Sequence, residues 1–266
     1  MPAIKRSEEE EAAAREHGSE FLETLARGLR IIDAFNASRR PMTLSELAKA
    51  AGLARATARR TLFTLEAGGY VASDNKHYAL TPRILTLATA YLGSNQVATI
   101  LQPIMDRIAD RAREVCSAAV LDGRQAVFIA RASPARVFTT GLELGLRLPA
   151  ASSSVGRVLL GRLSDDDLDQ HLAALDLKAV TPFTIVDRSV LKARIIADRQ
   201  QGYALVDQEA ELGFRSIAVP VRRHDGAIVA AMNVGAHVDR ISPGKMIDAF
   251  LPLLQAGVAE AKPLLV

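Results

Sequence analysis

The sequence predicts an α+β chain of two domains, a small N-terminal winged helix-turn-helix and a larger C-terminal domain, joined by a linker helix. Its length of 266 residues, 49% of them hydrophobic, is enough to bury two ordinary cores. The apolar pattern before Gly93 is helical apart from one short hairpin, and beyond Gly93 it alternates between helix and strand. Basic residues are concentrated near the N-terminus. Ten Lys and Arg face four acids from Leu25 to Arg83, whereas the remainder from Ile84 carries twenty against nineteen. A local excess of this kind indicates contact with a polyanion.

The N-terminal segment predicts three helices in succession. Apolar residues recur at spacings of three and four between residues 19 and 38, which is typical of an amphipathic helix. Thr43 and Glu46 have the spacing of a capping box, which predicts the start of a second helix. That helix ends at Gly52, and after a very short turn a third, basic helix runs to Gly68. Two short helices joined by a glycine-containing turn predict a helix-turn-helix.

A small hairpin and a linker helix are expected next. The β-prone runs 70–72 and 77–80 flank a polar turn and so predict the hairpin of a winged helix. Thr81 and Pro82 supply an N-cap and a first-turn proline for the linker helix. This helix is more apolar than a tether requires, so we expect it to pack on another surface, for example its own copy in a second chain.

The C-terminal domain is expected to place helices outside a largely antiparallel sheet. The expected elements are a helix near residues 102–115, two strands around Asp122-Gly123, an extended run ending at Pro149, two helices of which the second is capped by Ser164, a helix and strand over 191–205, a hairpin of buried strands around His224-Asp225-Gly226, and a closing helix over 242–262.

These elements divide the chain into an N-terminal arm (1–20), the winged helix-turn-helix (21–81), the linker helix (82–95) and the C-terminal domain (96–266). Cys116 is the only cysteine, which excludes an intrachain disulfide and a cysteine-cluster metal site. No apolar run approaches the roughly 18 residues of a membrane span. We therefore expect a cytoplasmic protein without membrane attachment, metal or cofactor.

The basic helix contains the stretch "LARATARRTL" over residues 53–62. A helix of this kind fits the major groove of DNA, where arginine can pair with guanine. We expect Arg55 and Arg59 to contact bases, Thr57 and Arg60 to lie nearer the backbone, and the small side chain of Ala56 to permit close approach. Taken alone, the exposed arginines favour solvated surface residues; the surrounding helix-turn-helix and hairpin reverse this and favour the DNA-binding interpretation.

Phosphate contacts are expected around this helix. The candidates are Thr43 at the preceding cap, Arg39 and Arg40 before it, and Lys76 and His77 at the tip of the hairpin.

Six stretches together resemble the IclR family of bacterial transcription regulators, over roughly residues 21–260. They are "LARGLRIIDAF", "MTLSELAKAAGLARATARRTLFTLEAGGYV", "LTPRILTLATAYL", "SSSVGRVLLG", "GYALVDQEAELGFRSIAVPV" and "AAMNVGAH". The chain looks most like the branch that controls catabolism of aromatic acids such as protocatechuate and 4-hydroxybenzoate. The resemblance implies a GAF-like C-terminal domain that binds a small organic acid effector, and a homodimer or tetramer that binds double-stranded DNA at a palindromic operator.

The effector positions are carried over from this resemblance. They correspond here to Ser154, Val155, Asp207, Ser216, Asn233 and Gly235. Ser153 adds a hydroxyl at the same helix start, although these serines could serve only as helix caps. Arg215 could bind the effector carboxylate or form a structural pair with Asp207 or Glu209. His237 could bind a phenolic hydroxyl or be an ordinary surface residue.

Two other functions remain as alternatives. A hydrolase could use the serines near residue 153 with Asp207 and His237, but no G-x-S-x-G elbow surrounds those serines, so no catalytic residue is expected. A DNA-binding protein without a ligand would leave about 170 residues of mixed α/β chain without a role.

Overall fold

The computed structural model describes residues 18, 20–38, 40–134 and 144–266. It divides into two compact units, Met1–Tyr91 and Leu92–Val266, and each is considered by itself below. The boundary falls within the segment expected to be the linker. The expected N-terminal arm lies almost wholly outside the described residues.

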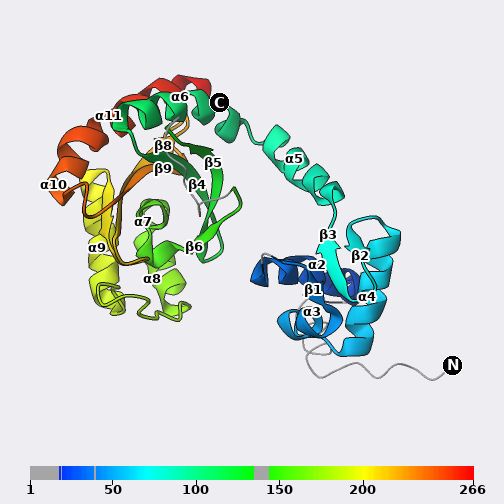
Figure 1. The fold of residues 1–266 in the computed structure, drawn as a ribbon. Coiled ribbons are helices and arrows are strands. Elements are labelled where there is room, and N and C mark those ends of the chain that lie inside the picture. The colour runs from blue at the N-terminus through cyan, green and yellow to red at the C-terminus, as the bar shows by residue number, and fades with distance from the viewer. Residues whose placement is uncertain (1–17, 19, 39, 135–143) are drawn as a thin grey trace. The chain divides into compact units, whose positions relative to one another are not determined.

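The first unit is a winged helix-turn-helix (Figure 1). Its elements are α2 (Glu23–Ala34), a 3-10 turn (Phe35–Ala37), β1 (Met42–Thr43), α3 (Leu44–Ala50), α4 (Arg55–Ala67), β2 (Val71–Ser73), β3 (His77–Leu80), a 3-10 turn (Pro82–Ile84) and α5 (Leu85–Ser94), which continues past the unit boundary. The strands form one antiparallel sheet in the order β1-β3-β2. The predicted helices and hairpin are confirmed, while β1 was not expected because two residues leave no detectable sequence pattern.

The capping box that opens the helix-turn-helix is confirmed. The Thr43 hydroxyl accepts a hydrogen bond from the Glu46 amide at 3.3 Å, and the Glu46 carboxylate accepts one from the Thr43 amide at 2.8 Å. Both free amides at the start of α3 are thereby satisfied by local sequence alone. The core below it is formed by one apolar face of each helix. Its buried members are Ile31, Ala34, Phe35, Met42, Leu47, Ala48, Ala51, Ala58, Leu62 and Val71.

The second unit is built on a six-stranded antiparallel sheet in the order β6-β5-β4-β9-β8-β7. Its strands are β4 (Val115–Asp122), β5 (Gln125–Ala132), β6 (Arg147–Pro149), β7 (Ala204–Asp207), β8 (Phe214–Arg222) and β9 (Ile228–His237). Its helices are α6 (Gln96–Ala112), α7 (Ser154–Leu160), α8 (Asp165–Ala173), α9 (Arg188–Gln201), α10 (Pro243–Lys245) and α11 (Leu251–Ala261), with a π-helical turn at Met246–Phe250 and 3-10 turns at Ala150–Ser152 and Lys262–Leu264. The expected order of elements is confirmed; part of the extended run before Pro149 lies outside the described residues.

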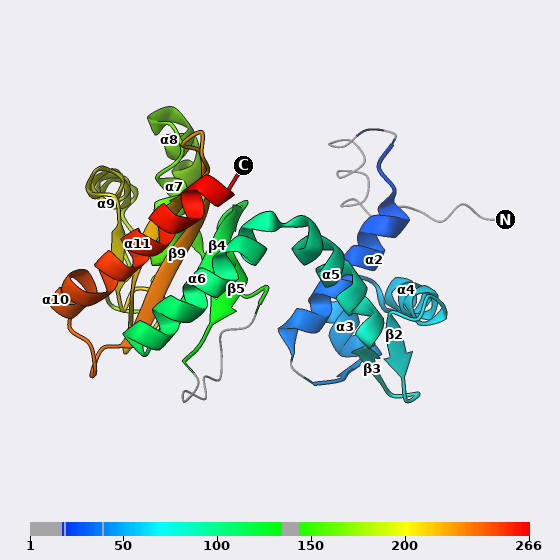
Figure 2. The same ribbon diagram turned by 90° about the horizontal axis from the view of Figure 1, so that it is seen from above.

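The sheet is curled, and helices cover both of its faces. Figures 1 and 2 show α6 and α11 side by side on the convex face and α7, α8 and α9 on the other. The main core lies under α6 and α11, and a second apolar cluster lies between α7 and the concave face. A Cβ atom on Gly156 would lie 2.2 Å from the carbonyl oxygen of Ala150, so only glycine lets α7 pass this close to the preceding turn. This close packing places the start of α7 inside the curl of the sheet.

In the part of the chain that the structure describes, no single helix is long and apolar enough to cross a membrane. One bent pair, Pro82–Tyr91 with Gln96–Ala112, meets the length and composition limits when its two helices are taken together.

Candidate functional site

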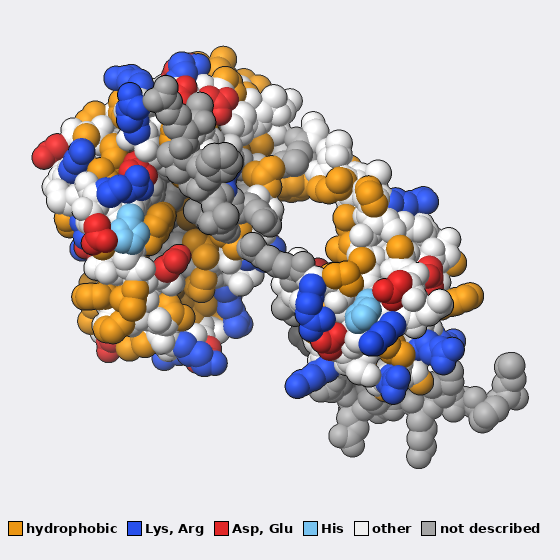
Figure 3. Space-filling model, viewed as in Figure 1, with side chains coloured by type: hydrophobic (Ala, Val, Ile, Leu, Met, Phe, Trp, Pro, Cys, Tyr) orange, Lys and Arg blue, Asp and Glu red, His pale blue; other side chains and the backbone are white. Residues whose placement is uncertain are grey.

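The helix α4 presents a basic outer face. Ala58 and Leu62 are fully buried against the core, while Arg55, Arg59 and Arg60 are exposed. None of these three arginines has an acidic partner among the described residues. Figure 3 shows Lys and Arg side chains gathered over the helix-turn-helix unit, at the lower right of the view. Unpaired guanidinium groups on an exposed helix are free to pair with phosphate or guanine.

The other residues expected to contact DNA lie within α4 and around the start of α3. Ala56 is exposed on the outer face of α4 and Thr57 is half-buried. Arg40 pairs with Glu46 at 2.6 Å, and this bond, with the Thr43 amide, lowers the pKa of Glu46 to about 2. The hydroxyl of Thr43 bonds to the same carboxylate at 2.9 Å. These two side chains therefore take part in the cap of α3.

Arg39 lies outside the described residues. At the hairpin tip, Asp74 accepts hydrogen bonds from the backbone amides of Lys76 and His77 at 2.9 and 2.7 Å, which lowers its pKa. Lys76 is exposed and His77 is half-buried, with its Nδ1 atom 3.5 Å from Asp74. The Asp74 side chain therefore closes the turn, and the Lys76 side chain is exposed at its tip.

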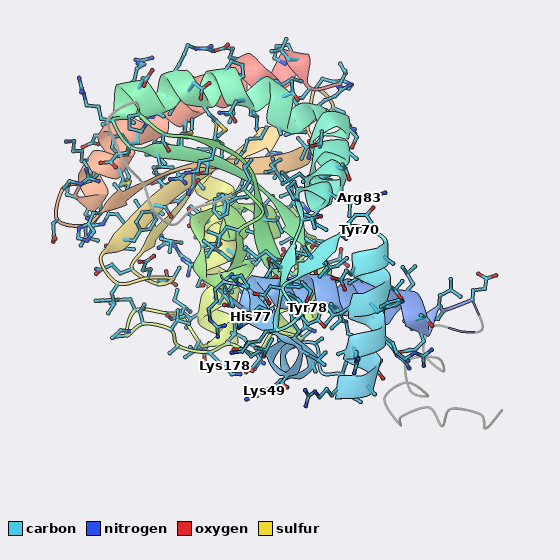
Figure 4. The ribbon with its side chains drawn as sticks, turned by 45° about the vertical axis from the view of Figure 1, so that its right-hand side comes forward. Lys49, Tyr70, His77, Tyr78, Arg83 and Lys178 are labelled. Carbon is cyan, nitrogen blue, oxygen red and sulfur yellow. The ribbon has the colours of Figure 1, made fainter. Side chains whose placement is uncertain are left out.

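The end of the wing is fastened to the end of α4. Thr81 donates from its hydroxyl to the Gly69 carbonyl at 2.5 Å and from its amide to the Tyr70 carbonyl at 2.9 Å. The guanidinium of Arg83 lies over the Tyr70 ring, 5.1 Å from its centroid (Figure 4). The start of the linker helix and the C-terminal end of α4 thus share one junction.

The second unit contains a cavity between the start of α7 and the concave face of the sheet, with about 410 Å³ of empty space, part of it open to solvent. The residues that line it are Phe128, Leu148, Ser152, Ser153, Ser154, Val155, Val206, Ala210, Phe214, Ser216 and Asn233. Two aromatic rings and several aliphatic side chains form its walls, and the serines and Asn233 supply neutral polar groups. This combination suits a small planar molecule with a few hydrogen-bonding atoms.

Polar groups in the cavity are only partly satisfied. The hydroxyls of Ser154 and Ser216 bond to each other at 2.7 Å, although they come from α7 and β8. Ser153 caps α7 by accepting from the Gly156 amide at 3.2 Å. The Oδ1 atom of Asn233 is buried without a hydrogen-bond partner. A buried acceptor of this kind costs free energy unless a donor reaches it, so it marks a place for a ligand or water.

Five of the nine positions expected to bind an effector lie along this cavity, namely Ser153, Ser154, Val155, Ser216 and Asn233. Asp207, Arg215, Gly235 and His237 are absent from the lining. The Nε atom of Arg215 donates to Asp207 at 3.1 Å and its Nη1 atom to the Ile241 carbonyl at 2.7 Å. The Nδ1 atom of His237 lies 3.2 Å from Asp239.

Gly235 does not line the cavity itself but packs against Phe214, which does. A Cβ atom at this position would lie 2.3 Å from the Cζ atom of Phe214, whose ring forms part of the cavity wall. Glycine at 235 therefore provides the space that the Phe214 ring occupies.

Replacing Gly235 with alanine should displace the Phe214 ring and lower the free energy of unfolding by about 1–3 kcal/mol, the usual cost of overpacking. Chemical denaturation of the full chain measures this. Gly244→Ala is the matched control, because a Cβ atom there meets nothing closer than 4.0 Å and the backbone is not left-handed. Equal stability of the two variants would contradict the interpretation.

A buried ion pair supports the loop beside the cavity. Arg157, on α7, is 1% exposed; its Nη2 atom lies 2.5 Å from the Glu209 carboxylate and its Nε atom donates to the Ala151 carbonyl. Thr184 bonds to the Glu209 carbonyl at 2.7 Å. Because Glu209 is next to the cavity residue Ala210, this pair fixes one wall of the cavity. Arg157 was not among the residues expected at the site, although an arginine inside the apolar stretch "SVGRVLLG" signals a buried charge that needs a partner.

A second acid completes this cluster. Asp198, on α9, is 2% exposed and lies 3.1 Å from Arg194. Burial raises the pKa of Asp198 to about 6, and the positive charges of Arg194 and Arg157 oppose this effect. Burial likewise lowers the pKa of Arg157, which Glu209 and Asp198 counteract.

The described residues offer little for metal or nucleophilic chemistry. No group of three or more His, Cys, Asp or Glu side chains in them could hold a metal ion. Cys116 is buried, which raises its pKa and disfavours the thiolate. None of the described residues that line the cavity is a histidine, acid or base that could activate the serines.

Two protein-family models match the chain. One, described as the IclR helix-turn-helix domain, matches residues 24–75, and the other, described as bacterial transcriptional regulator IclR C-terminal, matches residues 89–261. The chain is 42% identical over 238 residues to the Pca regulon regulatory protein of Pseudomonas putida, which covers 89% of this chain and 82% of that protein. It is 34% identical over 262 residues to the p-hydroxybenzoate hydroxylase transcriptional activator of Acinetobacter baylyi, with coverage of 94% and 97%.

A solved structure resembles the second unit. It is the inducer-binding domain of the PobR transcription factor from Acinetobacter, a double mutant in complex with 3-hydroxybenzoic acid. The match has 34% identity and a TM-score of 0.61, and it covers 63% of this chain and 98% of that one.

Proposed function

This chain belongs to the IclR family of bacterial transcriptional regulators, and from that premise we propose that it controls an operon for the catabolism of an aromatic acid in response to that acid or a close relative. As a family member it is a DNA-binding regulator with an effector-binding domain. Support for the aromatic class comes from the named relatives that regulate the Pca regulon and p-hydroxybenzoate hydroxylase, and from the similar domain that holds 3-hydroxybenzoic acid.

The main structural support for an aromatic-acid effector is the lining of the cavity. Phe128 and Phe214 supply aromatic walls, and Ser154, Ser216 and Asn233 supply neutral donors and acceptors. No lysine or arginine is found among the described residues of the lining. Hydroxyl and amide groups in the lining can hydrogen-bond to one carboxylate on a planar ring, whereas two carboxylates would double the cost of burying charge without a counter-charge.

A thermal-shift screen of the full chain tests the effector class. A ligand at 100 times its dissociation constant adds about 2.7 kcal/mol to folding stability, so the melting temperature should rise with 3-hydroxybenzoate, 4-hydroxybenzoate or protocatechuate. Short-chain keto acids and open-chain dicarboxylates form the comparison set. Stabilisation by these compounds and not by the aromatic acids would contradict the proposed class.

For the DNA, we propose that α4 enters the major groove. Arg55 and Arg59 contact bases, Ala56 allows the backbone to approach, and Thr57 and Arg60 lie near the phosphates. The exposed Lys76 and the adjacent His77 in the wing, together with Arg39, Arg40 and Thr43, stand close to the flanking backbone. The proposed assembly is a homodimer or tetramer in the cytoplasm, bound to a palindromic operator.

We propose no enzymatic activity. The described cavity residues bring serines together with no histidine or acid, and His237 is 53% exposed beside Asp239. The hydrolase alternative therefore lacks a base for its nucleophile. The alternative without a ligand leaves the cavity and the unpaired Asn233 acceptor without a role.

A further inference from the structure

Phe63 lies on the outside of α4 and is left uncovered. It is 72% exposed, the highest value among the large apolar side chains that the structure describes in the first unit. In the same helix Leu62 is fully buried and Leu65 is half-buried. Burial of a large apolar side chain is favourable, so a surface that covers Phe63 in the complex with its partner gains affinity.

The position of Phe63 on the helix makes it part of the basic face. It follows Ala56 by seven residues, Arg59 by four and Arg60 by three. Residues at these spacings share one side of an α-helix. The opposite side is the buried one, which carries Ala58 and Leu62. Whatever surface meets the exposed arginines therefore also meets the Phe63 ring.

Charge identifies that surface as a polyanion. Arg59 and Arg60 lie one turn before the ring on the same side of the helix and have no acidic partner among the described residues, and Glu66 is the only acid in α4. The major groove of DNA combines the required phosphates with an apolar group, the C5-methyl of thymine, which phenylalanine can contact.

We propose that Phe63 is a specificity residue that packs on a thymine methyl group in each operator half-site. This rests on the proposed placement of α4 in the major groove. At 1.5 Å per residue, Phe63 lies roughly 6 Å further along the helix than Arg59. The thymine is then roughly two base pairs from the base that Arg59 contacts, since base pairs are about 3.4 Å apart.

Deoxyuridine substitution tests the contact because it removes only the methyl group. Operator sites are first selected from random duplexes with the full-length protein, and affinity is then measured on duplexes that carry deoxyuridine at one thymine at a time. For the wild type we expect a loss of roughly fourfold at one thymine in each half-site, the value of one buried methyl. Phe63→Ala should bind the unmodified site about as weakly as the wild type binds a duplex with deoxyuridine at that thymine in both half-sites, and should show no further loss with deoxyuridine.

Two control variants distinguish a contact with the thymine methyl group from a general contribution to DNA affinity. Phe63→Leu keeps an apolar side chain and should keep the deoxyuridine penalty. Arg60→Ala should keep it as well, but should reduce the dependence of binding on salt by about one phosphate contact in each half-site, whereas Phe63→Ala leaves the salt dependence unchanged.

Three results would overturn the proposal. The first is a deoxyuridine penalty in Phe63→Ala equal to that of the wild type, and the second is no penalty for the wild type at any thymine. The third is a change of oligomeric state in Phe63→Ala on sedimentation, which would assign the ring to a second copy of the chain. If the wild type selects no site at all, the placement of α4 in the groove fails as well.

Discussion

Replacing Glu209 with glutamine should lower the free energy of unfolding of the C-terminal domain by about 3–5 kcal/mol, the cost of leaving one member of a buried ion pair without its partner. Arg157 is 1% exposed, and a guanidinium group stays protonated in proteins, so it cannot escape this cost by losing its proton. Asp198 shares the cluster, but its own pKa of about 6 shows that burial already disfavours its charge. Urea denaturation followed by circular dichroism measures the change.

An exposed pair provides the matched control. Arg107 and Glu260 lie 2.5 Å apart, the same distance as the buried pair, but their side chains are 55% and 54% exposed. Glu260→Gln should cost less than about 1 kcal/mol, because solvent screens exposed ion pairs. Equal losses for Glu209→Gln and Glu260→Gln would refute the role given to burial.

A double variant extends this test. With methionine at both Arg157 and Glu209, neither charge is left without a partner, so much of the stability lost in Glu209→Gln should return. Ala210, which lines the cavity, follows Glu209 directly. Loss of the ion pair in Glu209→Gln should therefore also disturb the cavity wall. If 4-hydroxybenzoate is the effector, it should no longer raise the melting temperature of Glu209→Gln.

Replacing Arg59 with alanine should abolish most of the discrimination between operator and random duplex. A bidentate arginine–guanine contact is worth about 1–3 kcal/mol, or roughly 5- to 150-fold in affinity, and a dimer would lose it in both half-sites. Fluorescence anisotropy with a selected site and a scrambled duplex measures the ratio. Binding of the wild type should also weaken steeply with salt.

Arg60→Ala is the comparison for this experiment. If Arg60 contacts a phosphate, its loss should weaken binding to both duplexes about equally. Full discrimination in Arg59→Ala would show that another side of α4 contacts the bases. Effector binding should be unchanged in both variants, because both positions lie in the first unit.

Local features of the fold were predictable because their causes are local. The Thr43 and Glu46 capping box involves residues three apart, and the structure confirms it. The partner of Arg215, in contrast, remained open between Asp207 and Glu209. The register of β7 on β8 places Asp207 opposite Arg215, and this settles the pairing. A pair across two strands depends on register, which single residues do not encode.

The cavity was predictable only in part for the same reason. Ser154, Ser216 and Asn233 came from family resemblance and Ser153 from its place at a helix start, whereas Phe128, Leu148, Val206 and Phe214 were not expected. These four come from four different strands, and alternation along a strand shows two faces without identifying the one that the sheet curls around. The buried charge of Arg157, in contrast, could have been predicted, because an arginine within an apolar helical stretch is visible in the sequence.

The junction at Thr81 determines how motion can pass within the first unit. With Thr81 bonded to Gly69 and Tyr70, and Arg83 stacked on Tyr70, the last turn of α4 and the first turn of the linker helix are held together. Because these contacts join the two segments, a displacement of α5 should also displace the C-terminal end of α4. Coupling between effector binding and DNA binding is reciprocal, so a displacement that passes through this junction would change both affinities by the same factor.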